Sequence, residues 1–327
     1  MIYIKNNSNN PYFNLAFEEY VFNNMHEADE YLLLWQNRPT IVVGKHQNTI
    51  EEINMDFIKA NSIQVVRRLS GGGAVYHDLG NLNFTFIVKN TESTSFDFKK
   101  FTLPVINALK KLGVEAEFNS RNDLAIKGKK FSGNSQYMKK NALLHHGTLL
   151  FNSDLEMLVK ALNVSNEKIV SKGIKSIRSR VTNIREHLDL DIGMPQFKEL
   201  LLKYLFEDEE IHEAELSEEQ TMEVKKLMEE KYNTWEWNYG ESPKFNVKKS
   251  QRLEYGKVDA FIDVEKGIIK GCKFHGDFFG SGDLGDIEGK LIGHKYDREE
   301  IKNVLSSIDI ERYFSKFSID DILNCVI

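Results

Sequence analysis

Hydrophobic residues recur at helical spacing in several stretches of the chain. The apolar positions between Phe13 and Val21 lie mostly three or four residues apart, which predicts a helix over residues 10–23 that begins at Asn10-Pro11. A second helix is predicted over Phe98–Leu112, where Gly113 is suited to end it. Shorter helices are predicted at Asp56–Asn61, Leu155–Leu162, Phe197–Leu205 and Glu218–Tyr232.

Short apolar or alternating runs predict strands between these helices. The strands have short links, which favours an α+β domain with a mixed, largely antiparallel sheet over a doubly wound parallel one. The predicted strands are Tyr31–Trp35, Thr40–Gly44, Ile63–Val66, Asn81–Val88, Val114–Phe118, Leu124–Ile126, Lys130–Ser132 and Leu143–Phe151.

The composition shifts around Glu241-Ser242-Pro243, and a second pattern of elements follows. This pattern is long enough for a small α+β domain with its own core. We therefore predict a catalytic domain over residues 1–243 and an accessory domain over residues 244–327. The accessory domain is predicted to contain strands Val247–Tyr255, Lys257–Val264 and Ile268–Phe274 and helices Arg298–Ser306 and Ile319–Val326.

Composition narrows the class of protein. The 327 residues include only two cysteines, Cys272 and Cys325, so a disulfide framework is not expected. We therefore expect a reducing, cytoplasmic compartment. The net charge of −6 disfavours a nucleic-acid binder, and no apolar run is long enough to cross a bilayer. The basic stretch Lys168–Arg185 is, from charge alone, read as a solvated face.

Three consecutive glycines, Gly71–Gly73, lie between two strand-like runs. Such a cluster lets the backbone approach a ligand closely and direct N–H groups at an anion. Arg67 and Arg68 precede it and His77-Asp78 follow it, so a phosphate-binding role is favoured over a merely flexible hairpin. The stretch is neither a Walker loop nor a dinucleotide fingerprint.

Two other stretches carry candidate chemistry. In Lys127–Gln136, strand alternation predicts Lys130, Ser132 and Asn134 on one face and Lys129 and Phe131 on the other. A lysine there suits a phosphate or carboxylate, although alone it is better read as part of a surface turn. His145 and His146 are adjacent on a predicted strand and face opposite sides, so we do not expect them to share a metal ion.

Together these stretches resemble the lipoate–protein ligase A family of the biotin/lipoate ligase superfamily. The resemblance covers nearly the whole chain in order, and its accessory part lies in SPKFN, DVEKG and HGDFFG (242–246, 263–267 and 275–280). The matching catalytic pieces are NLAFEE (14–19), RRLSGGGAVYHDLGN (67–81), RNDLAIKGKKFSGNSQ (121–136), HHGTLLFN (145–152) and KGIKSIRSRVTNI (172–184).

The resemblance implies a biotin/lipoate ligase-type catalytic domain and a mobile, lid-like accessory domain. It implies that lipoate and ATP form lipoyl-AMP and pyrophosphate. Mg²⁺ is expected to accompany ATP, and the resemblance does not identify the residues that bind the ion. The lipoyl group then passes to a lysine of an acceptor. The implied acceptors are lipoyl domains of 2-oxoacid dehydrogenase E2 subunits and the glycine cleavage H protein. A cytoplasmic monomer without nucleic-acid or membrane partners is expected.

Family positions also imply roles for residues of this chain. Lys130 would lie between the lipoate carboxyl oxygen and the α-phosphate, where two anions must meet. Arg68 and the backbone of Gly73, Ala74, Val75 and Tyr76 would bind the nucleotide, and Val75 and Tyr76 would also wall the adenine. The implied supporting residues are Ser70, Gly71, Gly72, His77, Asn122 and Asp123.

Octanoyl- and lipoyl transferases of the same scaffold are the main alternative, because they act through a cysteine thioester. Their nucleophile precedes the GKK-type motif, and here that stretch, Asn119–Asp123, contains no cysteine. A biotin ligase is disfavoured because the accessory domain resembles that of lipoate ligases. A degenerate, non-enzymatic paralogue is disfavoured by the intact Arg68, triple glycine and Lys130.

Overall fold

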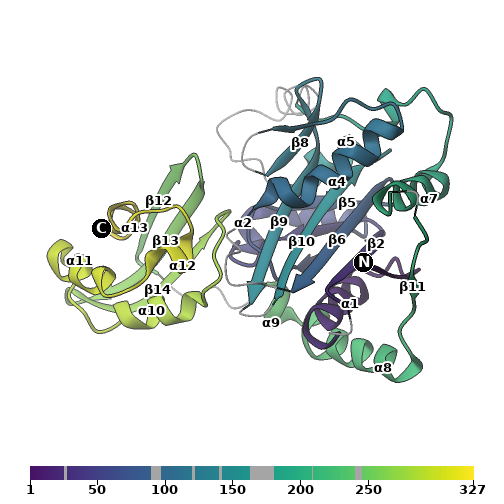
Figure 1. The fold of residues 1–327 in the computed structure, drawn as a ribbon. Coiled ribbons are helices and arrows are strands. Elements are labelled where there is room, and N and C mark those ends of the chain that lie inside the picture. Colours follow the sequence, from purple (N-terminus) through teal and green to yellow (C-terminus); the bar gives the residue numbers. More distant parts are fainter. Residues whose placement is uncertain are drawn as a thin grey trace. The chain divides into compact units, whose positions relative to one another are not determined.

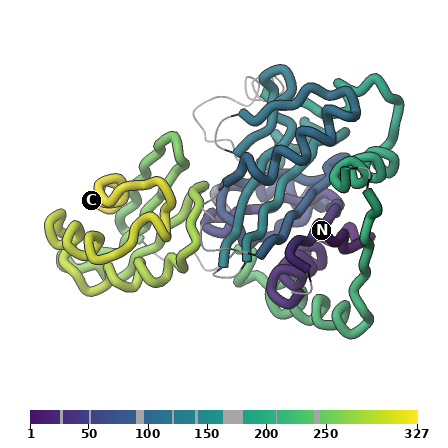
Figure 2. Tube along the Cα trace, viewed as in Figure 1, coloured from purple at the N-terminus to yellow at the C-terminus, as the bar shows by residue number. Residues whose placement is uncertain are grey.

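The computed structural model describes residues 1–25, 28–89, 97–119, 122–139, 142–162, 180–207, 209–239 and 245–327. The chain divides into two compact units. The first contains residues 1–42, 50–67 and 75–238, and the second contains residues 43–49, 68–74 and 239–327. The chain path shows that residues from 245 onward stay together in the second unit (Figure 2). The predicted boundary between residues 243 and 244 lies outside the described residues and stays a prediction.

An eight-stranded sheet is the centre of the first unit (Figure 1). All neighbouring strands are antiparallel apart from the two pairs that β1 makes, which are parallel. The predicted mixed, largely antiparallel sheet is therefore confirmed. In spatial order the strands are β11 (Glu213–Ala214), β1 (Ile2–Ile4), β2 (Glu30–Trp35), β6 (Asn81–Lys89), β10 (Ala142–Leu150), β9 (Lys129–Lys139), β8 (Asp123–Ile126) and β7 (Glu117–Asn119).

Helices cover both faces of this sheet, because its central strands are apolar on both sides. On one face, Phe84 and Phe86 of β6 pack in a core with α4 (Phe98–Lys111) and α7 (Met194–Leu205). On the other face, Leu33 and Trp35 of β2 and Ile87 of β6 pack with α1 (Pro11–Asn24) and α8 (Glu218–Leu227).

Local sequence signals explain the ends of the two predicted long helices. The Asn10 side chain accepts a hydrogen bond from the Tyr12 N–H, and Pro11 occupies the first helical position of α1. Asp97 caps α4 through the Lys100 N–H, and Gly113, with φ of +84°, follows its last turn. Both helices lie within one residue of their predicted bounds.

A small sheet in the order β4-β3-β5 lies in the first part of the chain, and the glycine cluster connects β4 to β5. Its strands are β3 (Thr40–Val43), β4 (Gln64–Arg67) and β5 (Val75–His77). The other helical segments that the structure describes up to residue 238 are α2 (Thr49–Glu52), α3 (Met55–Ala60), α5 (Leu155–Ala161), the 3₁₀ turn η1 (Ile184–His187), the π-helical turn η2 (Met228–Tyr232) and α9 (Trp235–Asn238). The predicted helix Glu218–Tyr232 thus consists of α8 followed by η2.

The C-terminal part of the second unit packs a three-stranded antiparallel sheet against helices. The strands are β12 (Val247–Leu253), β13 (Gly256–Glu265) and β14 (Ile268–Gly276), close to their predicted bounds. The helices are α10 (Leu284–Leu291), α11 (Arg298–Ser306), α12 (Ile310–Phe314) and α13 (Ile319–Val326), of which α11 and α13 match the prediction.

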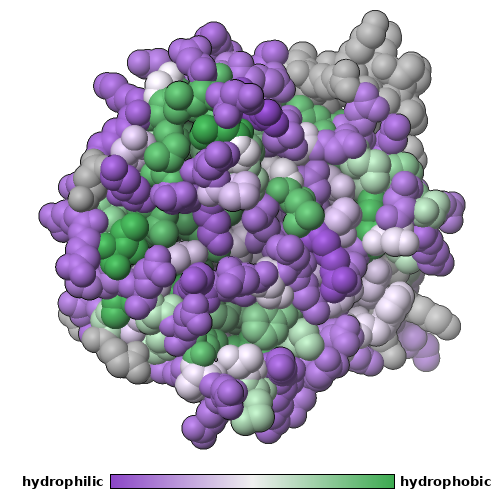
Figure 3. Space-filling view, turned by 90° about the vertical axis from the view of Figure 1, so that its right-hand side faces the viewer, coloured by the Kyte–Doolittle hydropathy of each residue, from purple (hydrophilic) through white to green (hydrophobic). Residues whose placement is uncertain are grey.

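On the face that Figure 3 shows, hydrophobic residues form separate small patches among hydrophilic ones. Among the described residues, no helix combines the length and the apolar character that crossing a membrane requires.

Candidate functional site

Lys130 and Asp123 form an ion pair at one end of the large sheet. The Lys130 Nζ lies 2.7 Å from the Asp123 Oδ1, and the two side chains are 41% and 27% exposed. The Lys130 backbone is fixed by a short parallel bridge, in which its N–H donates to the Arg180 carbonyl and its own carbonyl accepts from the Thr182 N–H. The ammonium is thus held in place yet accessible to a ligand.

A β-bulge in β9 changes the predicted face of Lys130. Ala125 pairs with Lys130 while Leu124 pairs with Ser132, so Phe131 is one extra residue. As a result, a Cβ built on Gly133 would lie 3.1 Å from the Lys130 Nζ, whereas Ser132 and Asn134 hydrogen-bond on the opposite face. The prediction that Lys130 shares a face with Ser132 and Asn134 was wrong, because strict alternation assumes a regular strand.

Polar residues continue from this ion pair across the same face of the sheet. Strand pairing aligns Asp123 with Gly133, and Asn83 with both Thr148 and Trp35. The Gly133 N–H donates to the Thr148 Oγ1 at 3.1 Å, which completes the row. This polar row (Asp123, Gly133, Thr148, Asn83 and Trp35) crosses β8, β9, β10, β6 and β2, which lie side by side in Figure 1.

A buried hydrogen-bond network lies beside the polar row, on the same face. Glu18, which is 1% exposed, accepts from the Thr85 hydroxyl at 2.6 Å and from the His146 Nδ1 at 3.0 Å. The Trp35 indole N–H donates to the same Thr85 oxygen at 3.0 Å. The network therefore fixes the ring of Trp35 at the apolar end of the row.

His145 points to the opposite face. Its ring stacks on Phe101 and hydrogen-bonds to the Gln136 amide at 2.9 Å. Burial, with a smaller contribution from His146, holds the pKa of His145 well below its usual value, so the ring is neutral. The described residues contain no cluster of His, Cys, Asp and Glu that could hold a metal ion.

Asn122 holds the turn before β8. Its side-chain amide donates to the Asn134 carbonyl at 2.5 Å, and its own carbonyl accepts from the Asn134 side chain at 3.0 Å. These contacts make Asn122 a support for the strands that carry Asp123 and Lys130. Arg121 and residues 168–179 of the basic stretch lie outside the described residues.

The glycine loop, residues 68–74, belongs to the second unit. The Arg68 guanidinium is buried and donates to the carbonyls of Gly71 and Gly73 at 2.6 and 2.8 Å, and to the Ser70 Oγ at 3.1 Å. Gly72 has φ of +90°, which disfavours any other residue there. Arg68 therefore shapes the loop from within, in addition to supplying a positive charge.

Within the same unit the loop contacts the segment that follows β14. The Gly72 N–H donates to the Phe278 carbonyl at 3.2 Å, and a Cβ on Gly71 would lie only 2.3 Å from that oxygen. The ring of His46 stacks on Phe278, with centroids 5.0 Å apart. Gly73 differs, because a Cβ there would meet nothing within 4 Å.

Arg67 has a structural role. Its Nε donates to the Trp237 carbonyl at 2.8 Å and its Nη2 donates to the Asn238 carbonyl at 3.2 Å. Burial lowers the pKa of Arg67 to about 10, and the side chain is turned toward α9. The sequence places two arginines before the glycines. It could not show that Arg67 binds backbone carbonyls of α9 instead of facing a ligand.

β5 leads from the glycine loop to the polar row. Tyr76 is buried, and burial together with Asp78 and Asp154 raises the pKa of its hydroxyl. The ring of His77 meets the ring of Trp35 edge-on at 6.2 Å, and its Nδ1 accepts from the Asn37 amide at 3.1 Å. His77, a predicted supporting residue, therefore lies beside the apolar end of the row.

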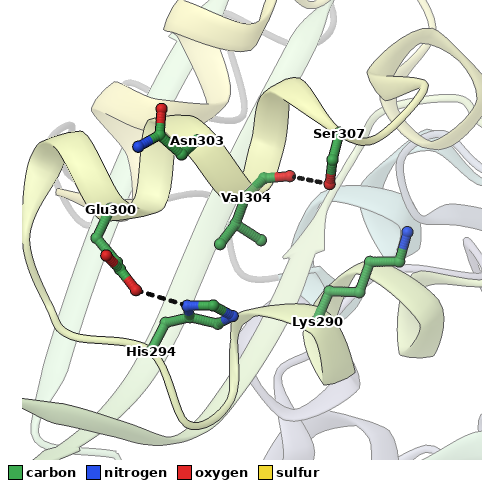
Figure 4. Close-up of a pocket in the computed structure, with 6 residues that line it drawn as sticks. All are labelled: Lys290, His294, Glu300, Asn303, Val304 and Ser307. Carbon is green, nitrogen blue, oxygen red and sulfur yellow. Dashed lines mark hydrogen bonds and ion pairs between the residues drawn. The ribbon is translucent and has the colours of Figure 1, made fainter.

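A surface hollow of about 360 Å³ in the second unit is a separate feature (Figure 4). His294 and Glu300 point toward one another across it, 2.8 Å apart, and the Ser307 hydroxyl donates to the Val304 carbonyl. None of the predicted site residues lines this hollow, so it is not the candidate site.

Residues 10–206 match the lipoyl protein ligase A/B catalytic domain, and residues 242–326 match the bacterial lipoate protein ligase C-terminus. Lipoate-protein ligase LplJ of Bacillus subtilis is 47% identical over 330 residues, which span 100% of both chains. Lipoate–protein ligase 1 of Staphylococcus aureus is 47% identical over 309 residues, 94% of each chain.

The chain belongs to the lipoyl protein ligase A/B family.

Solved structures of the family share the fold. P. falciparum LipL1 in complex with lipoate has a TM-score of 0.80 at 28% identity, with 94% of both chains covered. The bipartite lipoate protein ligase of Thermoplasma acidophilum, described together with its E2 lipoyl domain, has a TM-score of 0.67 at 31% identity, over 75% of this chain and 98% of that one. A lipoate-protein ligase A bound with ATP has a TM-score of 0.65 at 28% identity, over 73% and 98%.

Neither cysteine of this family member suits the thioester route. Cys272 and Cys325 are free and buried in the core of the second unit. Burial raises the pKa of Cys272, and it raises that of Cys325 to about 12, so neither thiol forms the reactive thiolate.

The sequence did not single out several residues that the fold brings to the same face of the sheet as Lys130. Thr148, Asn83 and Trp35 reach the row through strand pairing, and Glu18 reaches it from α1. The alternation of Asn81, Asn83 and Thr85 with aromatic and aliphatic residues was a signal for them, since buried polar residues on one strand face need partners or ligands.

Proposed function

We propose that this chain is an ATP-dependent lipoate–protein ligase. It joins lipoate to AMP with release of pyrophosphate and then transfers the lipoyl group to a lysine of an acceptor protein. The observation that carries the proposal is the accessible Lys130 ammonium beside the polar row, in a chain that matches lipoate–protein ligases over its full length.

Lys130 supplies the charge that the first half-reaction requires. The lipoate carboxylate must approach an α-phosphate that is also negative, and a fixed ammonium next to both lowers this repulsion. The Lys130–Asp123 ion pair sets the position of the ammonium before substrates bind, and the ammonium can then exchange one carboxylate oxygen for substrate oxygens. The Lys130 side chain is partly exposed, which leaves room for the substrate oxygens.

The glycine loop and β5 supply the nucleotide contacts. The backbone of Gly73, Ala74, Val75 and Tyr76 directs N–H groups at the phosphates, and Arg68 adds positive charge. Ser70, Gly71 and Gly72 support the loop, as their contacts with Arg68 and Phe278 indicate.

Mg²⁺ accompanies ATP. A magnesium ion in such a site is held mainly by phosphates and water with one or two carboxylates, and Asp123 is a partly exposed carboxylate on the polar row that fits this set. The ion would offset negative charge on the phosphates, and Asp123 would exchange its partner from Lys130 to the ion.

The acceptors are lipoyl domains of 2-oxoacid dehydrogenase E2 subunits and the glycine cleavage H protein. The structural relative from Thermoplasma acidophilum, which is described together with its E2 lipoyl domain, supports the first of these. We further propose that the chain acts as a monomer in the cytoplasm.

Residues 244–327 are proposed to act as a lid. Lipoyl-AMP must be kept from water while it forms, yet the acceptor lysine must reach it later. A change in the distance between spin labels on the two units on adding a non-hydrolysable lipoyl-AMP analogue is the expected result. Identical distance distributions with and without the analogue would contradict it.

Lipoate-dependent exchange of labelled pyrophosphate into ATP tests the function. We expect exchange with lipoate, none with biotin, and subsequent acylation of purified lipoyl domains. A covalent acyl-thioester on this chain, or transfer without ATP from an acylated carrier, would instead support a transferase. Exchange with biotin in place of lipoate would support a biotin ligase.

A further inference from the structure

Asn83 is a buried amide on the polar row whose donor group is not used. The residue is 2% exposed, and its Oδ1 accepts from the Asn81 amide at 2.9 Å. Its Nδ2 has no hydrogen-bond partner among the described residues. A buried donor that has lost its water partners and gained no others is destabilising, so an unpaired donor here indicates a ligand that pairs with it.

The position of Asn83 in the polar row indicates which ligand group could use this donor. Lys130 lies over Gly133, and Asn83 is two strands away on the same face, with Thr148 between them. Two strand spacings amount to about 10 Å. Two hydrogen bonds of about 2.9 Å each, one from either residue, leave about 4 Å, which a carboxyl or acyl-phosphate group can bridge.

The chemistry of the row decides which end of the ligand reaches Asn83. The row begins with the charged Asp123 and Lys130, continues through a hydroxyl and an amide, and ends at the ring of Trp35. An acyl chain with its carboxyl end at Lys130 and its apolar end toward Trp35 passes Asn83. The amide is therefore on the acyl side of Lys130.

We propose that the Asn83 amide donates a hydrogen bond to the acyl carbonyl oxygen and stabilises the negative charge that develops there. The proposal rests on the proposed ligase function. In the transfer step the acceptor amine forms a C–N bond to the carbonyl carbon, and the carbonyl oxygen becomes an oxyanion. The C–O bond to phosphate then breaks, AMP leaves with that electron pair, and the nitrogen loses a proton to water.

A buried, preorganised donor is suited to this task. It stabilises an oxyanion more than a neutral carbonyl, so it accelerates the step with little gain in ground-state affinity. The Asn81 amide holds the Asn83 side chain by its oxygen and so turns the N–H₂ group away from Asn81.

The test uses the full chain with Asn83→Asp, which keeps the acceptor for Asn81 and replaces the donor by an oxygen, and Asn83→Ala as a second variant. The rate of single-turnover transfer from added lipoyl-AMP to a lipoyl domain is measured. The affinity for a non-hydrolysable lipoyl-AMP analogue is measured in parallel. For Asn83→Ala we expect a transfer rate lower by about 10²–10³-fold, with affinity within about tenfold of the unmodified protein.

Gln136→Glu is the matched control, because it makes the same amide-to-acid change in a buried residue on the opposite face of the sheet. It should lower the melting temperature and leave the transfer rate of the folded protein unchanged. Asn83→Ala with normal transfer, or with affinity reduced in proportion to the rate, would overturn the role of Asn83. Lack of lipoate-dependent exchange by the unmodified chain would refute the ligase function itself.

Discussion

The Nζ of Lys130 lies 2.7 Å from the Oδ1 of Asp123, on strands that are neighbours in the sheet. Partly exposed ion pairs of this kind contribute only about 0–1 kcal/mol to stability. The pair therefore has little value as a stabilising contact, and its effect is to fix the ammonium in one place. This makes the function of Lys130 separable from folding.

Replacing Lys130 by alanine should abolish most adenylation while the melting temperature changes little. The lost charge contact is expected to cost about 3–4 kcal/mol in the transition state, or about 10²–10³-fold in the rate of lipoate-dependent pyrophosphate exchange. Lys129→Ala is the control, since Lys129 is the exposed neighbour on the other face. Normal exchange by Lys130→Ala would remove Lys130 from the catalytic residues.

Gly73→Ala tests the approach of the glycine loop to the nucleotide. A Cβ at Gly73 meets nothing within 4 Å and its φ is not positive, so the ligand-free protein should unfold at an unchanged temperature. Gly72 is less suitable, since its φ of +90° would strain any replacement. Calorimetric titration should show weaker binding of ATP or a lipoyl-AMP analogue.

The control for the loop is Gly289→Ala in α10, which is equally open around its Cβ position and remote in sequence from the loop. It should bind nucleotide normally. If Gly73→Ala also binds normally, the backbone at Gly73 does not approach the nucleotide closely.

The cysteines can be replaced without loss of ligation. Cys272→Ala combined with Cys325→Ala should leave both half-reactions intact, because both thiols are buried in the core of the second unit. The loss of buried atoms should lower the free energy of unfolding, which chemical denaturation can measure. Loss of transfer in the folded double variant at 20 °C would argue for a thioester intermediate.

The buried, neutral His145 predicts a dependence of stability on pH. The unfolded chain takes up a proton on this ring below about pH 6.5, whereas burial keeps the pKa in the folded protein well below that value. The unfolded state then binds more protons, so the free energy of unfolding should fall by about 1.4 kcal/mol per pH unit between about pH 6.5 and 5.

The pH prediction is checked by urea unfolding of the unmodified protein and of His145→Gln. The variant should be less stable at every pH, but its free energy of unfolding should no longer fall by the contribution of this proton between about pH 6.5 and 5. An unchanged slope in His145→Gln would show that another group is responsible.

Helical spacing predicted the long helices, and short apolar runs predicted most strands, because the central strands are buried on both faces. Val114–Phe118 was wrong in part, since Val114 packs in the core directly after α4 and the strand β7 begins only at Glu117. The short elements β1, β11, α10 and α12 were missed. β1, for example, has three residues, too few to show a period.

The candidate site could be predicted only where motif residues are contiguous. Lys130 and the glycine loop were found in this way. Thr148, Asn83 and Trp35 come together through pairings of strands that are distant in sequence, and nothing local indicates their register. The engagement of Arg67 by Trp237, 170 positions away, is a second example.

The extra residue at Phe131 has a consequence for insertions and deletions. Lys130 reaches the open face only because β9 carries one residue more than β8 at this point. Deleting Phe131 would place Lys130 directly before Ser132 and so leave the lysine on the open face. One more residue in β8 opposite Phe131 would instead make both strands regular and turn Lys130 toward the face that α4 covers. Homologues that differ in length between residues 123 and 133 should therefore be compared by strand register before they are compared by motif.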